Sequence, residues 1–387
     1  MFDVVIIGQG LAGLLTAIRA KQENKRVAVI AEGTGKIMQS TGFMDLIPSS
    51  SQNLDESKHL FLQKNISEEL IDQSVEWFKA LMNEINLPYE GSVHFLSPVV
   101  TGAGYVKNTA LYPTTVRPIP NKGDILIVGL NGIIDFQPTY VKENLMKERP
   151  DLNVSTVTVD FFKGSGRVLS QVDAARAMDD KQVRARFITS LKNEMRTKEI
   201  ATPDLMIFPS CLGMVNHKDV IEDLNDSIGP VTEAPGLPPN AAAIRLHDAL
   251  HHYAVKKGVR FYEDETVFHA KVYDGVVTEV LTGNQTKPQA IKLKQLVVAS
   301  GGILGGGLEQ VSTGLSDRTL SLPITSEGTL VDPINNIFYI GSSSKMPWSE
   351  TWISGGIYTI SSSYSVPFTS MDEKNKRRDE KCYINQA

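Results

Sequence analysis

Three glycines near the start of the chain have the spacing of a dinucleotide-binding turn. In VVIIGQGLAG, an apolar run that predicts a buried parallel strand is followed by glycines spaced G-x-G-x-x-G. Such glycines make the tight bend, let the backbone approach a pyrophosphate and let the next helix lie close to the strand. That helix supplies free N–H groups and the positive end of its dipole. We therefore predict a pyrophosphate site at Gly8, Gly10, Leu11, Ala12 and Gly13.

An acidic residue follows at the place where a ribose would bind. The stretch RVAVIAE ends at Glu32, about 20 residues after the third glycine, where an acid hydrogen-bonds a ribose hydroxyl in dinucleotide folds. The alternative is a polar residue that only ends a strand. Glycine spacing alone is a weak signal in a chain with 30 glycines, so its position between a strand and a helix carries the prediction.

Later segments predict the sheet that must position these residues. After a helix over 241–258, RFYEDETVFHAKVYDGVVTEVLTG predicts a β-meander with a hairpin turn at Asp274 and Gly275. AIKLKQLVVASGG then predicts a buried strand ending in small residues. This order returns the chain to the sheet that begins near residue 4. The fold class is α/β, with a Rossmann-like central parallel sheet and a β-meander.

An inserted α/β region is predicted between these parts. Residues 1–50 and 238–368 form a discontinuous cofactor domain, 51–237 an inserted substrate or cap region, and 369–387 a polar tail that we expect to be poorly ordered. Within the insertion, a strand at 125–128 runs into Gly129 and Gly132, and a helix is expected over 173–196. With two glycines and no acid at the proper spacing, this turn is interpreted as structural packing, and a second nucleotide site remains the alternative.

Composition excludes several classes of protein. The 387 residues carry a net charge of −5, which gives no reason to expect nucleic acid as a partner. Two distant cysteines predict neither a disulfide framework nor a zinc or iron–sulfur cluster, and favour a cytoplasmic protein. His247 and His251 have i, i+4 spacing but no third ligand, so no metal site is predicted. The N-terminus lacks a basic signal-peptide region, and no apolar run approaches the roughly 20 residues of a membrane span.

Three separated motifs resemble those of flavoproteins with a glutathione-reductase-type nucleotide fold. They are VVIIGQGLAG with Glu32, LVVASGG, and NNIFYIGSSS near the C-terminus. The resemblance implies a flavin, with the second motif close to the cofactor and the third beside the flavin ring. Besides the first motif, the implied cofactor residues are Ser40, Thr41, Gly42, Val267, Ala299, Ser300, Gly301, Gly341 and Ser342.

More narrowly, the chain resembles the family formed by the B subunit of anaerobic glycerol-3-phosphate dehydrogenases. Segments that carry this include STGFMDLIP, ILIVGLNGIIDFQP, LPPNAAAIRL and VVASGGILGGGL. The resemblance implies oxidation of sn-glycerol 3-phosphate to dihydroxyacetone phosphate. It also implies electron delivery to quinone through two partners, the catalytic flavin subunit and the membrane-anchored iron–sulfur subunit. The chain would then be cytoplasmic and peripheral at the inner face of the membrane.

The type of flavin and the activity have alternatives. The family is credited with FMN, whereas the first motif and Glu32 suit FAD, because FMN has no adenosine or second phosphate. Three features depart from the flavoprotein pattern. Ser342 stands where the third motif usually has aspartate, and the stretch from Gly307 to Asn335 is shorter than the family pattern leads us to expect. The segment ISGGIYTISSSYSV is rich in poor helix formers where a helix is expected. The rival hypotheses are a stand-alone flavin oxidoreductase of another substrate, and a non-catalytic scaffold or electron-relay protein of the same complex.

The sequence says less about the residues that act on the substrate than about those that bind the cofactor. Oxidising a secondary alcohol needs a hydride acceptor, a base for the hydroxyl proton and cations for the phosphate. The candidates for phosphate binding are Arg176, Arg245 and Lys107, and solvated surface charge is the alternative for each. None of the seven histidines falls in a motif that fixes a role, so no catalytic base is named.

Overall fold

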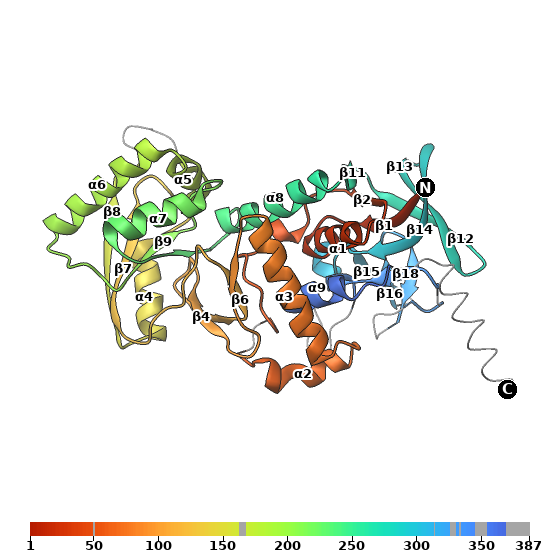
Figure 1. The fold of residues 1–387 in the computed structure, drawn as a ribbon, viewed down its shortest axis with the longest axis horizontal. Helices are drawn as coiled ribbons and strands as arrows, with labels where there is room; N and C mark the ends of the chain where they lie inside the picture. Colours follow the sequence, from red (N-terminus) through yellow and green to blue (C-terminus); the bar gives the residue numbers. More distant parts are fainter. Residues whose placement is uncertain are drawn as a thin grey trace. The chain divides into compact units, whose positions relative to one another are not determined.

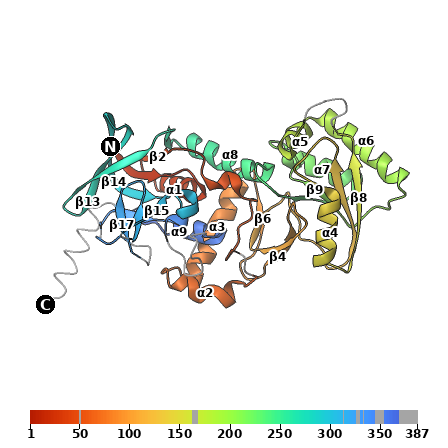
Figure 2. The same ribbon diagram turned by 180° about the vertical axis from the view of Figure 1, so that it is seen from behind.

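The protein forms two compact units. The structure is a computed structural model that describes residues 1–48, 51–161, 168–312, 314–325, 330–332, 334–344 and 354–368. The motif unit comprises Met1–Lys36, Lys58–Glu76 and the chain from Leu250 onward; the inserted unit comprises Ile37–Ser57 and Trp77–Ala249 (Figures 1 and 2). The boundaries predicted near residues 50 and 238 stay a prediction about where cofactor and substrate bind. The predicted tail at 369–387 lies outside the described residues.

A seven-stranded sheet is the centre of the motif unit. Its order is β11-β2-β1-β14-β13-β12, and β18 also pairs with β14. Strands β11, β2, β1, β14 and β18 run parallel, whereas β12, β13 and the first part of β14 form an antiparallel meander. The strands are β1 (Phe2–Ile7), β2 (Val27–Ala31), β11 (Arg260–Glu263), β12 (Val267–Tyr273), β13 (Val276–Asn284), β14 (Lys287–Val298) and β18 (Ile337–Tyr339).

The predicted return of the chain to its first strand is confirmed. Asp274 and Gly275 both have positive φ, 50° and 70°, as a type I′ hairpin turn between β12 and β13 requires. After the meander, β14 lies parallel to β1, with Val5 opposite Leu296. Both strands are apolar because the sheet is covered on both faces here. The α/β class with a central parallel sheet and a meander is therefore confirmed.

Helices and a small sheet complete the motif unit. Seven consecutive residues of α9 are buried, although its sequence is rich in serine, and α9 lies beside α1 in both views (Figures 1 and 2). The elements are α1 (Leu11–Gln22), α9 (Gly356–Tyr364), η2 (Ile303–Gly305), η3 (Gly341–Ser343) and the antiparallel strands β15 (Leu308–Val311), β16 (Gly314–Asp317) and β17 (Leu322–Ile324). Helices α2 (Leu54–Leu62), α3 (Glu68–Glu84) and α8 (Ala241–Lys256) each contain residues of both units.

The inserted unit contains a second parallel sheet, in the order β10-β9-β7-β8. Helix α4 covers one face and α6 and α7 the other (Figures 1 and 2), because right-handed crossovers run in opposite directions from β7. The elements are β7 (Gly123–Leu130), α4 (Pro138–Glu148), β8 (Leu152–Val159), α5 (Gln171–Met178), α6 (Lys181–Thr197), β9 (Leu205–Pro209), α7 (His217–Ile228) and β10 (Val231–Ala234). Short pieces are η1 (Lys36–Gln39), β3 (Tyr89–Gly91), β4 (Ser97–Val100), β5 (Val106–Thr109) and β6 (Leu111–Pro113).

The single helix predicted over 173–196 is wrong, because two helices form there. Ser170 caps α5 through a capping box with Asp173, and Asp180 caps α6. Between them, the Asp179 carboxylate accepts hydrogen bonds from the N–H groups of 214–216. These tertiary bonds fix the break between α5 and α6. In the described part of the chain, every helix is too short or too polar to cross a membrane.

Candidate active site

The turn from β1 to α1 has room for a ligand at one glycine only. A Cβ on Gly8, where φ is +101°, would lie 2.4 Å from the Ala299 carbonyl oxygen. A Cβ on Gly13 would lie 1.9 Å from the Gly8 carbonyl oxygen. At Gly10, in contrast, a Cβ would have nothing within 4 Å, so the space above this residue is open. Two glycines thus serve close packing, and the third leaves the approach that a pyrophosphate needs.

Helix α1 begins without a side-chain cap. Its N-cap is Gly10, which makes no side-chain hydrogen bond, and the first turn holds no acidic residue. The first intrahelical bond runs from the Leu14 N–H to the Gly10 carbonyl at 3.0 Å. The N–H groups at Leu11 and Ala12 are therefore left for an anion, which the helix dipole also favours.

The loop after β2 returns to this turn. Glu32 directly follows β2 and is exposed at its carboxyl end. Gly35, with φ of +75°, approaches so closely that its Cβ would lie 3.0 Å from the Gly10 Cα. The carboxylate predicted to bind a ribose is therefore on a loop that packs against the first motif. Val267, at the start of β12, is buried in the sheet core, so that only its backbone is left for a ligand.

The second motif continues β14 alongside β1. The Ala299 N–H donates to the Ile7 carbonyl at 2.8 Å, and Gly301 then turns the chain with φ of +94°. Gly307 closes on this turn, because its Cβ would lie 2.2 Å from the Gly301 carbonyl oxygen. Ser300, which stands between Ala299 and Gly301 in the sequence, has its hydroxyl oxygen buried.

The third motif packs directly on the first. At the end of β18, Gly341 adopts φ of +52°, and its Cβ would lie 2.9 Å from the Ala12 Cβ. Ser342 shares a hydrogen bond of 2.9 Å with Ser354, just before α9. The structure thus brings the three motifs together within the motif unit, although Gly13 and Gly341 are far apart in the sequence.

Two buried polar atoms fit a ligand at this place. Gln9 stands between Gly8 and Gly10 in the sequence, and Ser300 belongs to the second motif. The Gln9 side-chain oxygen and the Ser300 hydroxyl are both buried, and among the described residues neither has a hydrogen-bond partner. A buried polar atom without a partner costs about 1–3 kcal/mol. Together with the open space at Gly10, these atoms fit a polar ligand such as a dinucleotide.

The predicted loop at Ser40, Thr41 and Gly42 belongs to the inserted unit, where it is held at both ends. The Asn240 side-chain amide donates to the Ser40 carbonyl at 2.9 Å, and the buried Tyr89 hydroxyl donates to the Gly42 carbonyl at 2.8 Å. These bonds fix the loop conformation. The contact of this loop with a flavin stays a prediction.

The three predicted phosphate ligands, also in the inserted unit, differ in how far they are engaged. Arg245 is buried and pairs with the buried Glu233, while also donating to the Gly213 carbonyl and the Thr115 hydroxyl. A phosphate would have to displace Glu233. Lys107 pairs with Asp45 at 2.5 Å. Arg176 is exposed, and its nearest carboxylate oxygen, on Asp173, is 3.9 Å away.

The two glycines at the end of β7 differ in their surroundings. A Cβ on Gly129, still within β7, would lie 2.3 Å from the Pro138 ring at the start of α4, whereas a Cβ on Gly132, in the turn that follows, would have nothing within 4 Å. In a doubly wound sheet, ligands bind where the strand order reverses, here between β7 and β9. That place is occupied by the Gln171 side chain, which accepts from the Ser210 N–H at 3.1 Å and donates to the Leu237 carbonyl at 3.0 Å. These contacts support the interpretation of this turn as structural packing.

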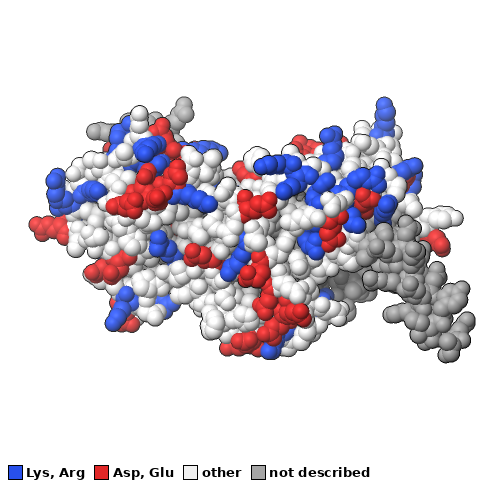
Figure 3. Space-filling view, in the orientation of Figure 1, with Lys and Arg blue, Asp and Glu red and all other residues white. Residues whose placement is uncertain are grey.

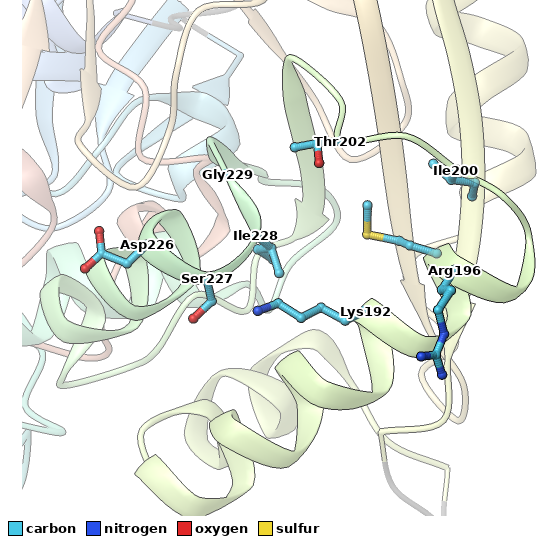
Figure 4. A pocket seen from close by; sticks show the side chains of 9 residues that line it. Lys192, Arg196, Ile200, Thr202, Asp226, Ser227, Ile228 and Gly229 are labelled. Atoms are coloured by element: carbon cyan, nitrogen blue, oxygen red, sulfur yellow. The ribbon is translucent and has the colours of Figure 1, made fainter.

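A cavity of about 440 Å³ lies elsewhere in the inserted unit, between α6 and α7 (Figure 4). It is open to solvent, and its lining includes charged side chains of both signs, Lys192, Arg196 and Asp226 (Figure 4). None of the predicted cofactor or phosphate residues lines it. Acidic and basic side chains are interspersed on the visible face of each unit, without an unbroken basic surface (Figure 3).

Comparisons with curated proteins identify relatives along most of the chain. A protein of Mannheimia succiniciproducens is 26% identical over 333 residues, covering 79% of this chain and 75% of its own. Proteins of Yersinia pestis and Vibrio cholerae are 25% and 27% identical, each over 84% of this chain and 80% and 78% of their own. All three are named as the B subunit of anaerobic glycerol-3-phosphate dehydrogenase.

Among solved structures, 3-ketosteroid Δ1-dehydrogenase from Sterolibacterium denitrificans matches with a TM-score of 0.34 and 16% identity over 78% of this chain. L-proline dehydrogenase from P. horikoshii matches with a TM-score of 0.29 and 13% identity over 77% of this chain. The chain spans about half the length of these proteins, 48% and 52%. Similarity at this level supports no inference about activity.

The FAD binding domain family matches residues 3–333, which include the first and second motifs. The flavin predicted from the motifs is thereby confirmed as FAD, the form that the first motif and Glu32 suit. The relatives named as the B subunit confirm the resemblance drawn from the sequence. With its three converging motifs and this match over most of its length, the chain belongs to the FAD binding domain family.

Proposed function

We propose that this chain is the B subunit of a glycerol-3-phosphate:quinone oxidoreductase. It oxidises sn-glycerol 3-phosphate to dihydroxyacetone phosphate, and its electrons reach quinone through the catalytic flavin subunit and the membrane-anchored iron–sulfur subunit of the complex. The observation that carries the proposal is the similarity to three proteins named as the B subunit over about four fifths of the chain. The convergence of the three motifs supports a flavin site in the same chain.

In this proposal the motif unit holds FAD. N–H groups at the start of α1 bind the pyrophosphate, the Glu32 carboxylate accepts a hydrogen bond from a ribose hydroxyl, and the turns at Ala299, Gly301 and Gly341 approach the rest of the cofactor. Bound FAD supplies the acceptor for the hydride that leaves the secondary alcohol carbon. The hydroxyl proton goes to a base, and the alcohol becomes a ketone.

Two candidate cations remain for the substrate phosphate. Lys107 and Arg176 do not have to leave a buried partner to bind it, in contrast to Arg245. A doubly charged phosphate at Lys107 would compete with Asp45 for the ammonium group. We carry both residues as phosphate ligands in the proposal.

The test is anaerobic reduction of the bound flavin by glycerol 3-phosphate. The chain is purified alone and with its two partner subunits, and flavin absorbance is followed after adding substrate. Bleaching by glycerol 3-phosphate but not by glycerol supports the proposal, because only the former carries the phosphate. Bleaching of the lone chain by another alcohol would favour a stand-alone enzyme. Tight FAD binding without bleaching, even in the complex, would favour the hypothesis that the chain is a scaffold or an electron relay.

A further inference from the structure

Two buried serines hydrogen-bond to glycines of the second and third motifs: Ser343, within the third motif, and Ser362, on α9. Ser343 is fully buried, and its hydroxyl accepts from the Gly301 N–H at 2.9 Å and lies 3.4 Å from the Gly301 carbonyl, to which it donates. Ser362, on α9, is 6% exposed; its hydroxyl accepts from the Gly341 N–H at 3.1 Å and donates to the Thr359 carbonyl at 3.2 Å. Each hydroxyl therefore acts as donor and acceptor at once.

Both serines hold glycines in a conformation that the chain does not adopt by default. Gly301 and Gly341 have φ of +94° and +52°. Glycine enters this region freely but also leaves it freely, so an isolated turn of this kind samples many conformations. A hydrogen bond to the glycine N–H, buried at Gly341 and half-buried at Gly301, selects one of them, and removing it leaves that donor without its partner.

The fixed turns are the ones that meet the first motif. Gly341 packs against Ala12 in the first turn of α1, where a Cβ would come within 2.9 Å of the Ala12 Cβ. A second serine of α9 adds a contact here: the Ser363 hydroxyl lies 2.7 Å from the Thr359 carbonyl and 3.2 Å from the Ala12 carbonyl. The serine-rich composition that makes α9 a weak helix former therefore provides side-chain bonds to two of the motifs.

We propose that Ser343 and Ser362 are positioning residues that preorganise the FAD site by fixing the turns at Gly301 and Gly341. The proposal rests on FAD binding by the motif unit and is independent of which alcohol is oxidised. In this proposal, α9 supports the cofactor site through the side-chain hydroxyl of Ser362, and not through the N–H groups at its N-terminus.

The experiment compares three alanine variants of the full chain. Ser343→Ala and Ser362→Ala remove a bond to a motif glycine. Ser361→Ala is the matched control, because Ser361 is also buried on α9 but pairs with Ser74 at 2.8 Å, away from the motifs. FAD affinity is measured by quenching of flavin fluorescence, and apoprotein stability by urea unfolding.

We expect FAD binding to weaken about three- to tenfold in Ser343→Ala and in Ser362→Ala, as for loss of one net hydrogen bond. Ser361→Ala lowers apoprotein stability but leaves FAD affinity unchanged. Ser362→Thr keeps the hydroxyl and restores affinity. If either alanine variant fails to fold, Ser343→Cys or Ser362→Cys replaces the hydroxyl by a somewhat larger thiol that forms weaker hydrogen bonds, and FAD affinity falls in the same direction.

Equal FAD affinity in the unaltered chain and in both motif variants would overturn the proposal, as would an equal loss in Ser361→Ala. Failure of the proposed function looks different: FAD then binds normally, and glycerol 3-phosphate does not reduce it. A shift of the visible flavin spectrum in Ser343→Ala and Ser362→Ala, absent in Ser361→Ala, is the second readout expected.

Discussion

At the scale of single residues, the glycines of the first motif have separable tasks. Gly8 and Gly13 have no space for a side chain, whereas a Cβ on Gly10 would meet nothing within 4 Å, and Gly10 has an ordinary φ of −69°. Folding therefore requires the first two. In the proposed function, Gly10 is a glycine because the pyrophosphate of FAD approaches its backbone.

Replacing Gly10 tests this separation. Gly10→Ala is expected to keep the apoprotein's stability within about 1 kcal/mol, since the backbone conformation suits alanine and nothing is near the new methyl group. FAD binding should weaken at least tenfold, because the methyl group occupies the pyrophosphate approach. The control is Gly33→Ala, where the added Cβ also meets nothing within 4 Å. Unchanged FAD affinity in Gly10→Ala would contradict the site.

The buried ion pair of Arg245 and Glu233 predicts a large stability effect. Arg245→Met should lower the free energy of unfolding by about 3–5 kcal/mol, because Glu233 would remain buried without its partner. Adding Glu233→Gln should recover part of the loss. Urea unfolding of the single and double variants measures both. A stable Arg245→Met variant with a raised KM for glycerol 3-phosphate would instead favour the phosphate role.

At the scale of elements, the helix ends of the inserted unit are fixed by groups distant in sequence. The Asp179 carboxylate ends α5 and binds the backbone before α7, and α7 begins with the buried His217. Burial and, after it, the positive charge of Arg245 lower the pKa of His217 to about 4. This environment therefore favours the neutral form of the His217 imidazole.

This lowered pKa predicts loss of stability in mild acid. An unfolded histidine has a pKa of about 6.5, so below that value the unfolded chain binds a proton that native His217 does not bind. The stability that neutral His217 contributes to the folded state is complete above pH 6.5 and is lost as the pH falls towards 4. Between pH 7 and pH 5, His217 should account for a loss of about 2 kcal/mol. Urea unfolding of His217→Gln should show a smaller loss over the same interval. An equal loss of stability in His217→Gln and in the unaltered chain would show that other titratable groups cause it.

At the scale of the whole molecule, the chain combines a complete set of cofactor motifs in one unit with a second α/β unit. The described helices include none that crosses a membrane. The relatives are named as one subunit of an enzyme, so the chain works in a complex in the proposed function. Delivery of electrons to quinone is then assigned to partners.

Membrane association is expected to depend on those partners. Expressed alone, the chain should stay in the supernatant after membranes are sedimented. Co-expressed with the flavin and iron–sulfur partners, it should sediment with them, and salt washing tests how it is held. Equal sedimentation with and without the partners would contradict the division of labour in the proposal.

The sequence by itself determined the cofactor motif, the parallel sheet and the meander. These features depend on local rules: glycine spacing after an apolar strand, apolar strands buried on both faces, and an Asp-Gly turn. The family relationship also follows from the sequence, because three motifs in one order are specific. The break between α5 and α6 was missed, because the Asp179 bonds that fix it reach the backbone at 214–216.

Only the tertiary structure decided which residues support the site. Gln9 and Ser343 lie inside the first and third motifs, and Gly307 lies in the segment VVASGGILGGGL, but no motif assigns these three a role. Gly35 and Ser362 lie outside the three motifs, and nothing local in the sequence sets them apart from other glycines and serines. Arg245 similarly has the charge of a phosphate ligand, and only the fold shows that Glu233 neutralises it in a buried site. The burial of a side chain and its hydrogen-bond partners depend on contacts between segments distant in the chain. A sequence pattern therefore specifies the residue types that suit FAD, and the tertiary structure determines which other residues fix their positions.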